Sequence, residues 1–300
     1  MPRMDVNWIA ATPAVFVVLW STGFIGAKLG LPFSEPFTFL FTRMAIVAGL
    51  LSALAVVLRS AWPRSLAEAG HIAVSGLLVH AAYLGGVFAA IHAGMPAGLC
   101  SLIVGLQPLL TAMLARRVVG ERVTPRQWLG LSLGLAGVTL VLGDKLAPAG
   151  AAVFAGFGPG ALGLSAMALA GITAGTLYQK RFCSGMNLAS GTAIQNAASA
   201  VAMGLAALTF ETMRIEWTAQ FVFALAWLVL VLSLAAISLL MLLIRRGAVS
   251  RVASFFYLVP PLTALEAWLL FDERLGAMAL AGMLVVAAAV ALVIGRPANG

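Results

Sequence analysis

The chain has 300 residues, of which 62% are hydrophobic and only 9% are charged. About a quarter of the residues of a soluble domain are charged, so this composition excludes a soluble globular protein and indicates an integral membrane protein. The formal net charge is +8, but the arginines lie in short clusters between apolar runs, which is typical of membrane topology signals and not of a nucleic-acid surface. Cys100 and Cys183 lie far apart and predict neither a disulfide framework nor a CxxC metal site.

Ten apolar stretches are long enough for a helix of about 20 residues across a bilayer core. Glycine, proline and charged residues separate them. In chain order the predicted spans are 9–29, 36–58, 71–91, 95–115, 125–143, 160–180, 187–209, 220–244, 247–271 and 276–295. The first stretch lacks a basic leader and a small-residue cleavage site, so we expect a membrane span there and not a cleaved signal peptide.

The positions of Lys and Arg predict the orientation, because these residues favour the cytoplasmic side. With the N-terminus in the cytoplasm, 13 of them fall on the cytoplasmic side, 4 fall on the opposite side, and Arg43 lies within a span. We therefore expect both termini in the cytoplasm, with the protein in a bacterial inner membrane.

An internal repeat relates the two halves at an offset of 152 residues. The phrase LQPLLTAMLARRVVGER begins at Leu106, and LVPPLTALEAWLLFDER begins at Leu258. The rarer residues that match in this frame are Pro108 and Pro260, Thr111 and Thr263, Glu121 and Glu273, and Arg122 and Arg274. Because each half holds five spans, the second half enters the membrane from the opposite side. The sequence therefore predicts an all-α membrane protein with ten transmembrane helices in two inverted five-helix repeats, residues 1–148 and 153–300, an architecture of many secondary transporters.

Three segments resemble the EamA domains of the drug/metabolite transporter superfamily. They are LWSTGFIGAKLGL at 19–31, the segment 94–143, and the phrase that ends in Glu273. The resemblance covers almost the whole chain. It implies a cavity between the halves lined by helices 1, 3, 4, 6, 8 and 9, and transport of amino acids, other metabolites, nucleotide sugars or phosphorylated compounds. Ser21 departs from the family pattern, which has glycine after the tryptophan.

Polar side chains within spans are candidate site residues, because they are costly in a membrane unless paired or hydrated. His80 and Tyr83 are spaced i, i+3 and share a helix face, where a histidine can exchange a proton and a tyrosine can stack and donate a hydrogen bond. The alternative is a histidine bonded to a neighbouring carbonyl beside an aromatic core residue. The helices that the family uses add further substrate-binding candidates, namely Trp20, Ser21, Gln107, Tyr178, Gln179 and Tyr257.

Three charged residues are candidates for charge binding or coupling. Glu266 breaks the repeat, since its counterpart is Leu114, and is either a proton-coupling or amine-binding carboxylate or a carboxylate hydrated near the external mouth. Arg43, whose counterpart is Gln195, either clamps a substrate carboxylate or extends toward the external face. Lys28 ends the first span, where it either contacts the substrate or extends to the membrane surface.

These patterns favour a secondary transporter, an exporter of amino acids or related small metabolites driven by the substrate gradient or by proton exchange. The alternatives are a transporter of other metabolites or drugs, a channel-like or sensory membrane protein, and an intramembrane enzyme. An enzyme is disfavoured because the sequence has no HExxH motif, no GxSG motif and no facing pair of aspartates within spans, and it has no Walker A motif for ATP hydrolysis. The oligomeric state stays open, and we expect a small-molecule substrate and the lipid bilayer as partners, with no metal, cofactor or nucleic acid.

Overall fold

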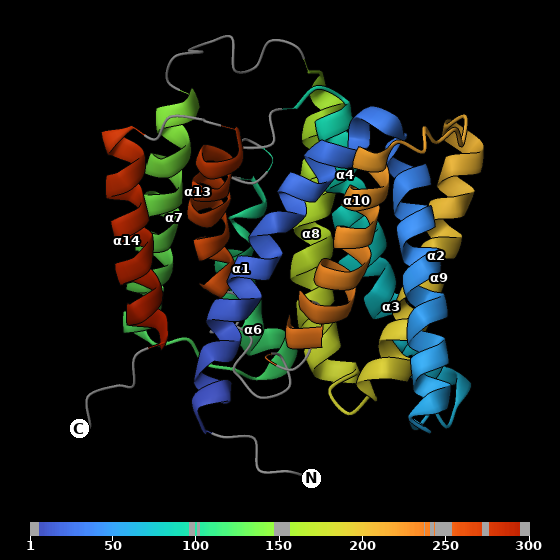
Figure 1. Ribbon diagram of the computed structural model, residues 1–300. Coiled ribbons are helices and arrows are strands. Elements are labelled where there is room, and N and C mark those ends of the chain that lie inside the picture. Colours follow the sequence, from blue (N-terminus) through green and yellow to red (C-terminus); the bar gives the residue numbers. More distant parts are fainter. Residues whose placement is uncertain are drawn as a thin grey trace.

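The structure, a computed structural model, describes residues 6–95, 100, 103–146, 157–236, 238–240, 243, 254–271 and 276–294. These residues form a bundle of helices with short connections (Figure 1). Within the described part of the chain, the only isolated β-bridge joins Ser34 and Ile215 in antiparallel fashion.

The helices follow the chain in an order that resembles the predicted spans. The first half contains α1 (Val6–Gly30), α2 (Pro36–Val57), α3 (Leu66–Gly76), α4 (Tyr83–His92), α6 (Gln107–Val119) and α7 (Pro125–Leu146). The second half contains α8 (Pro159–Phe182), α9 (Leu188–Phe210), α10 (Ala219–Trp227), α13 (Val259–Phe271) and α14 (Ala277–Ile294). The π-helical segments are η2 (Leu77–Ala82), between α3 and α4, and η4 (Leu228–Ala236), after α10, and the 3-10 turns are η1 (Leu31–Phe33) and η5 (Phe255–Leu258).

Proline and capping residues explain where several helices begin. Pro36, Pro125 and Pro159 occupy first-turn positions of α2, α7 and α8, where the missing N–H costs nothing. The predicted starts at 36, 125 and 160 are therefore confirmed to within one residue. The third span begins at Leu66, earlier than the predicted 71, because the Ser65 side chain accepts a hydrogen bond from the backbone N–H of Glu68 and caps the helix. The predicted spans 95–115, 220–244, 247–271 and 276–295 lie partly outside the described residues.

Within the described residues, six helical segments are long and apolar enough to cross a membrane. They are Thr12–Phe33, Pro36–Val57, Leu66–His92, Pro159–Phe182, Leu188–Phe210 and Ala219–Leu240.

The distribution of side chains on α9 is the reverse of that on a soluble helix. Gln195, Asn196 and Ser199 are buried, whereas Val201, Leu205 and Leu208 are between 61% and 70% exposed. Water would disfavour such an exposed apolar face, but lipid solvates it. The composition and this arrangement together identify an integral membrane protein.

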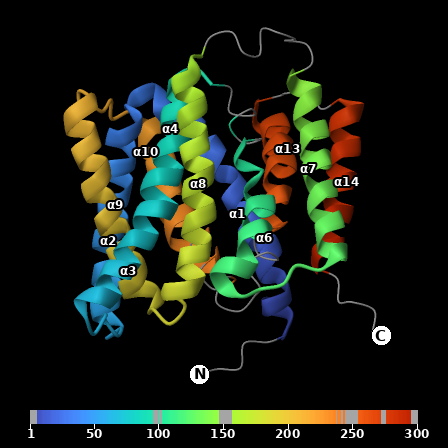
Figure 2. The same ribbon diagram turned by 180° about the vertical axis from the view of Figure 1, so that it is seen from behind.

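Two tightly packed pairs of helices form the two sides of the bundle, and the other helices lie between them. α7 packs along α14 at one side of the bundle, and α2 packs along α9 at the other (Figure 1, Figure 2). Between them, α1 contacts α10, η4 and α13, while α8 contacts α3, η2, α4 and α6. The beginning of α1 and the end of α14 lie at the same end of the bundle (Figure 1).

Two glycines let α8 approach the π-helical segment η2. A Cβ atom on Gly171 would lie 2.9 Å from both the Leu78 carbonyl oxygen and the Tyr83 nitrogen. A Cβ on Gly175 would meet Val79 at 2.5 Å. Such distances are below normal contact, so these small residues are required for close packing, and that packing fixes the helix that carries His80 and Tyr83.

The loops at one end of α2 and α9 are joined by two carboxylates. Glu211 accepts hydrogen bonds of 2.7 Å from the backbone nitrogens of Phe37 and Thr38 and from the Thr38 hydroxyl, so it caps the N-terminus of α2. Glu35 accepts hydrogen bonds of 2.7 Å from the hydroxyl and the backbone nitrogen of Thr212. The side-chain hydrogen bond from Thr212 is the main reason that the pKa of Glu35 lies below its ordinary value.

Candidate functional site

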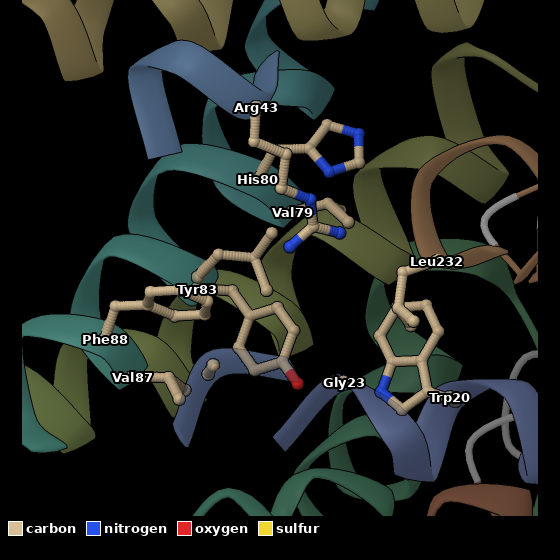
Figure 3. Close-up of a pocket in the computed structure, with 11 residues that line it drawn as sticks. Trp20, Gly23, Arg43, Val79, His80, Tyr83, Val87, Phe88 and Leu232 are labelled. Atoms are coloured by element: carbon tan, nitrogen blue, oxygen red, sulfur yellow. The ribbon is translucent and has the colours of Figure 1, made fainter. Parts of the chain in front are cut away.

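A small cavity lies between α1, α2, η2, α4 and η4 (Figure 3). Its volume is about 40 Å³, which is enough for a few water molecules. A whole organic solute would therefore enter only if the surrounding helices moved apart. The lining residues are Trp20, Gly23, Ala27, Arg43, Val79, His80, Tyr83, Leu84, Val87, Phe88 and Leu232.

The π-helical segment η2 contributes two of the predicted site residues to this cavity. A π turn holds an extra residue and often occurs at functional sites. His80 lies within η2, and Tyr83 is the first residue of α4, directly after it. His80 is 1% exposed and its Nε2 has no hydrogen-bond partner among the described groups. The predicted pair is thus brought together at one cavity.

Arg43 enters the cavity from α2. The side chain is 4% exposed, so it does not extend to the end of the bundle as one interpretation of the sequence expected. Its Nε donates a hydrogen bond of 3.0 Å to the Ser233 hydroxyl of η4. Figure 3 shows the rest of the guanidinium pointing toward Tyr83 and Trp20.

Aromatic rings form one wall of the cavity. The Trp20 and Tyr83 rings are nearly parallel, at 7° with their centroids 6.5 Å apart. Phe256 contacts Trp20 edge-on, with centroids 5.2 Å apart, and Phe16 packs beside both. This packing holds Trp20 in place, and the ring faces of Trp20 and Tyr83 that line the cavity offer stacking and apolar contact to a solute.

Ser21 and Glu266 meet outside this cavity, where α1 contacts α13. The Ser21 hydroxyl donates a hydrogen bond to Oε1 of Glu266. Thr263 donates to the Ser21 carbonyl oxygen at 3.3 Å. The second carboxylate oxygen of Glu266, Oε2, is buried and has no partner among the described groups. Glu266 therefore lies against α1 within the bundle, with one oxygen free to accept a proton or a hydrogen bond.

Tyr178 and Gln179 contact α3 instead of lining the cavity. The Tyr178 hydroxyl lies 2.6 Å from Nδ1 of His71, and the His71 ring stacks on Phe182 with centroids 4.7 Å apart. Gln179 accepts a hydrogen bond of 2.8 Å from the Ser75 hydroxyl. His71 and Ser75 were not predicted as site residues, because nothing in their local sequence reveals a partner on a distant helix.

The remaining predicted residues are also not among those that line the cavity. Gln107 is buried and donates a hydrogen bond of 3.1 Å to Thr111 on its own helix. Tyr257 is fully buried against Gly134, and its hydroxyl has no partner among the described groups. Lys28 is exposed near the end of α1. None of these three residues lines the cavity.

Among the residues that the structure describes, no three His, Cys, Asp or Glu side chains form a group that could hold a metal ion. The polar groups at the cavity are instead a guanidinium, an imidazole, a phenol and an indole. Together they can donate hydrogen bonds and stack, which suits an organic solute with an anionic or accepting group.

Comparison with known proteins points to membrane transport. Residues 8–143 match the EamA-like transporter family. The chain is 28% identical to YvbV, named an uncharacterized transporter of Bacillus subtilis, over 98% of this chain and 93% of that protein. It is 28% identical to a protein of Escherichia coli K12 named a probable amino-acid metabolite efflux pump, over 90% and 89% of the two chains.

Two further similarities extend over most of the chain. The Escherichia coli K12 protein YedA, named an uncharacterized inner membrane transporter, is 25% identical over 92% of this chain and 87% of its own length. A solved crystal structure aligns with a TM-score of 0.77 at 18% identity, covering 94% of this chain and 96% of that one. At this identity, the structural similarity establishes a shared fold and nothing about the solute.

Proposed function

Because this chain is an EamA-type protein of the drug/metabolite transporter superfamily, we propose that it exports amino acids or related small metabolites across a bacterial inner membrane. The names of two relatives support the class of solute and the location, since one is called an amino-acid metabolite efflux pump and another an inner membrane transporter. The observation that carries the proposal is the cavity lined by Trp20, Arg43, His80 and Tyr83, to which the second half of the chain contributes Leu232.

The helix bounds support two structural repeats, residues 1–148 and 153–300. Adding 152 to the bounds of α6 (Gln107–Val119) gives 259–271, which are the bounds of α13. The same shift takes α2 to 188–209, and α9 spans Leu188–Phe210. It takes the start of α7 from 125 to 277, where α14 begins.

The directions and contacts of the helices support an inverted relation between these repeats. In Figure 1, α1 rises from the lower end, whereas its counterpart α8 descends from the upper end. The outer pairs, α2 with α9 and α7 with α14, join counterparts to each other. Exchange of the two halves also converts the contact of α1 with α13 into the contact of α8 with α6, and both occur. We propose ten membrane helices related by a pseudo-two-fold axis in the membrane plane.

The π-helical segments support movement at the cavity. Shifting η2 (Leu77–Ala82) by 152 positions gives 229–234, which lies within η4 (Leu228–Ala236). Irregular helical turns provide places where a helix can bend, and transporter sites often lie beside interrupted helices. His80 from η2 and Leu232 from η4 both line the cavity. Bending at these two segments would open the cavity to one side of the membrane and then to the other.

The proposed orientation places both termini in the cytoplasm. The end of the bundle where α1 begins and α14 ends also holds the C-terminal ends of α2 and α8 (Figure 1). Arg64 and Arg181 lie at or just beyond those helix ends, and positive charge favours the cytoplasmic side.

Glu266 is the proposed coupling residue. Its carboxylate accepts a hydrogen bond from Ser21 of α1, the residue that follows Trp20. The second carboxylate oxygen has no hydrogen-bond partner among the described groups. If it carries the coupled proton, Glu266→Gln should make transport independent of a pH gradient while leaving exchange of solute intact. Unchanged pH dependence in this variant would reject proton coupling through Glu266.

Transport is tested with the purified protein in liposomes that are loaded with a mixed amino-acid pool. We expect at least one component to leave faster than from protein-free liposomes, and His80→Ala and Tyr83→Ala to slow that efflux while the proteins remain folded. Absence of stimulated efflux for every component, with and without a pH gradient, would reject the proposal. Wild-type rates in both variants would remove these residues from the site.

A further inference from the structure

Arg43 carries a buried positive charge that no carboxylate balances within the described residues. The side chain is 4% exposed, and its described hydrogen bond, to Ser233, is with a neutral hydroxyl. Among the described residues, the only ionisable side chain found to act on the guanidinium is the Tyr83 phenol, and no carboxylate does. A buried charge without a partner is strongly destabilising, because the protein replaces its hydration incompletely. Such a group is retained where something else supplies the opposite charge.

The geometry leaves the binding side of the guanidinium facing the cavity. Ser233 accepts the hydrogen bond from Nε, so the two terminal amino groups stay available. Figure 3 shows them pointing toward Tyr83 and Trp20. The planar guanidinium matches a carboxylate in a two-pronged hydrogen-bonding arrangement. The aromatic rings then offer apolar contact to the rest of such a solute.

The positions equivalent to Arg43 and Ala27 in the other half of the chain hold different residues, and the comparison shows how the two halves differ. At an offset of 152, Arg43 corresponds to Gln195 and Ala27 corresponds to Gln179. There, Gln195 donates a hydrogen bond of 2.7 Å to the Gln179 carbonyl oxygen and another to the Ser75 hydroxyl. Neutral, mutually hydrogen-bonded amides therefore fill the space in one half. In the other half, a small alanine leaves the space open and an arginine charges it.

We infer that Arg43 binds the carboxylate of the transported solute, with Trp20 and Tyr83 contacting its apolar part. One arginine balances one negative charge, which matches a carboxylate better than a phosphate dianion. That the bound solute is also transported rests on the proposed function, but binding at this site can be measured without transport. Arg43 is then a specificity-determining residue, because a solute without an anionic group would leave the buried guanidinium unpaired.

The test uses the purified full-length protein in detergent and a set of probes that share one phenyl group. They are L-phenylalanine, 3-phenylpropionate, 2-phenylethylamine and phenyl phosphate. Binding is measured by titration of intrinsic tryptophan fluorescence and by ligand-dependent thermal stabilisation. We expect the two carboxylates to bind and the amine not to bind. We expect Arg43→Gln to weaken carboxylate binding on the order of ten- to a hundredfold, as loss of a charged hydrogen-bonding pair implies.

Three variants separate recognition from general damage. Arg43→Lys keeps the charge but loses the planar fork, so it should bind carboxylates with intermediate affinity. Ala27→Gln keeps Arg43 but places a glutamine where Gln179 stands in the other half, and it should abolish binding by filling the cavity. Arg64→Gln removes an exposed arginine outside the cavity and should behave as wild type.

Several results would overturn the inference. They are equal binding of amine and carboxylate by the wild type, no binding of either carboxylate, tighter binding of phenyl phosphate, or unchanged carboxylate affinity in Arg43→Gln. If Arg43→Gln does not fold, probe selectivity of the wild type together with Arg43→Lys decides the matter. Carboxylate-selective binding without any efflux would reject transport and leave the assignment of Arg43 in place. Efflux limited to uncharged or cationic solutes would reject the assignment of Arg43 and leave the transport function in place.

Discussion

Replacement of Glu211 by alanine should detach the N-terminus of α2 from the loop after α9. The carboxylate accepts three hydrogen bonds of 2.7 Å, two from backbone nitrogens of the first turn of α2 and one from the Thr38 hydroxyl. Loss of a capping side chain costs about 0.5–2 kcal/mol, and loss of a negative charge at a helix N-terminus costs about 0.3–1 kcal/mol. We therefore expect Glu211→Ala to lower the free energy of unfolding by about 1–3 kcal/mol. Glu211→Gln keeps one acceptor oxygen and should lose about half of that.

The free energy of unfolding can be measured by titrating the detergent-solubilised protein with SDS and following tryptophan fluorescence. Glu216→Ala is the matched control, since Glu216 lies in the same loop, is exposed, and contacts Phe33 through its backbone nitrogen. Indistinguishable unfolding curves for Glu211→Ala and Glu216→Ala would refute the capping argument. A loss in Glu211→Gln as large as in Glu211→Ala would assign the effect to the charge alone and not to the number of hydrogen bonds.

Other changes have equally specific expected outcomes. Because the pKa of Glu35 is lowered in the folded protein, its contribution is present at neutral pH and is lost as the pH falls below about 4.5; Glu35→Gln should therefore flatten the acid limb of stability against pH, and parallel curves would contradict this. Gly171→Ala should lower thermal stability and transport, because its Cβ meets backbone atoms at 2.9 Å, whereas Gly163→Ala on the same helix faces open space and should do neither. Tyr178→Phe removes the 2.6 Å contact with His71 and should cost about 1 kcal/mol; an unchanged melting temperature would show that this contact contributes nothing.

Local sequence signals predicted the helices well where the signal has a direct physical cause. Proline at 36, 125 and 159 stops one segment and starts the next, so the starts of α2, α7 and α8 could be predicted to within one residue. The π-helical segment η2 could not be predicted, because no residue type within Leu77–Ala82 is particular to a π turn. In the folded protein α8 packs against η2, and no local sequence pattern encodes that contact.

The candidate site was predicted in part for a related reason. Polar side chains are costly in free energy within a bilayer, and this singles out Arg43, His80 and Tyr83 one by one. The spacing of His80 and Tyr83 along the helix places these two on one face. Which residues pair across the bundle is a property of the tertiary structure. Arg43 and Ser233 are 190 positions apart in the chain, and no local pattern encodes that contact. Ser21 was predicted as a substrate-binding residue. It does not line the cavity, and its hydroxyl donates a hydrogen bond to Glu266 of α13.

The two π-helical segments also bear on the history of the chain. Each π turn accommodates one residue more than an α-helix would, as a single inserted codon would produce. Under the proposed repeat, η2 and η4 occupy equivalent positions in the two halves. One insertion in a single ancestral gene, before that gene was duplicated and fused, accounts for both, whereas a later origin requires the same event twice. The widened turn then predates the divergence of the halves, and residues such as His80 and Leu232 differentiated afterwards on a framework that was already irregular at this point.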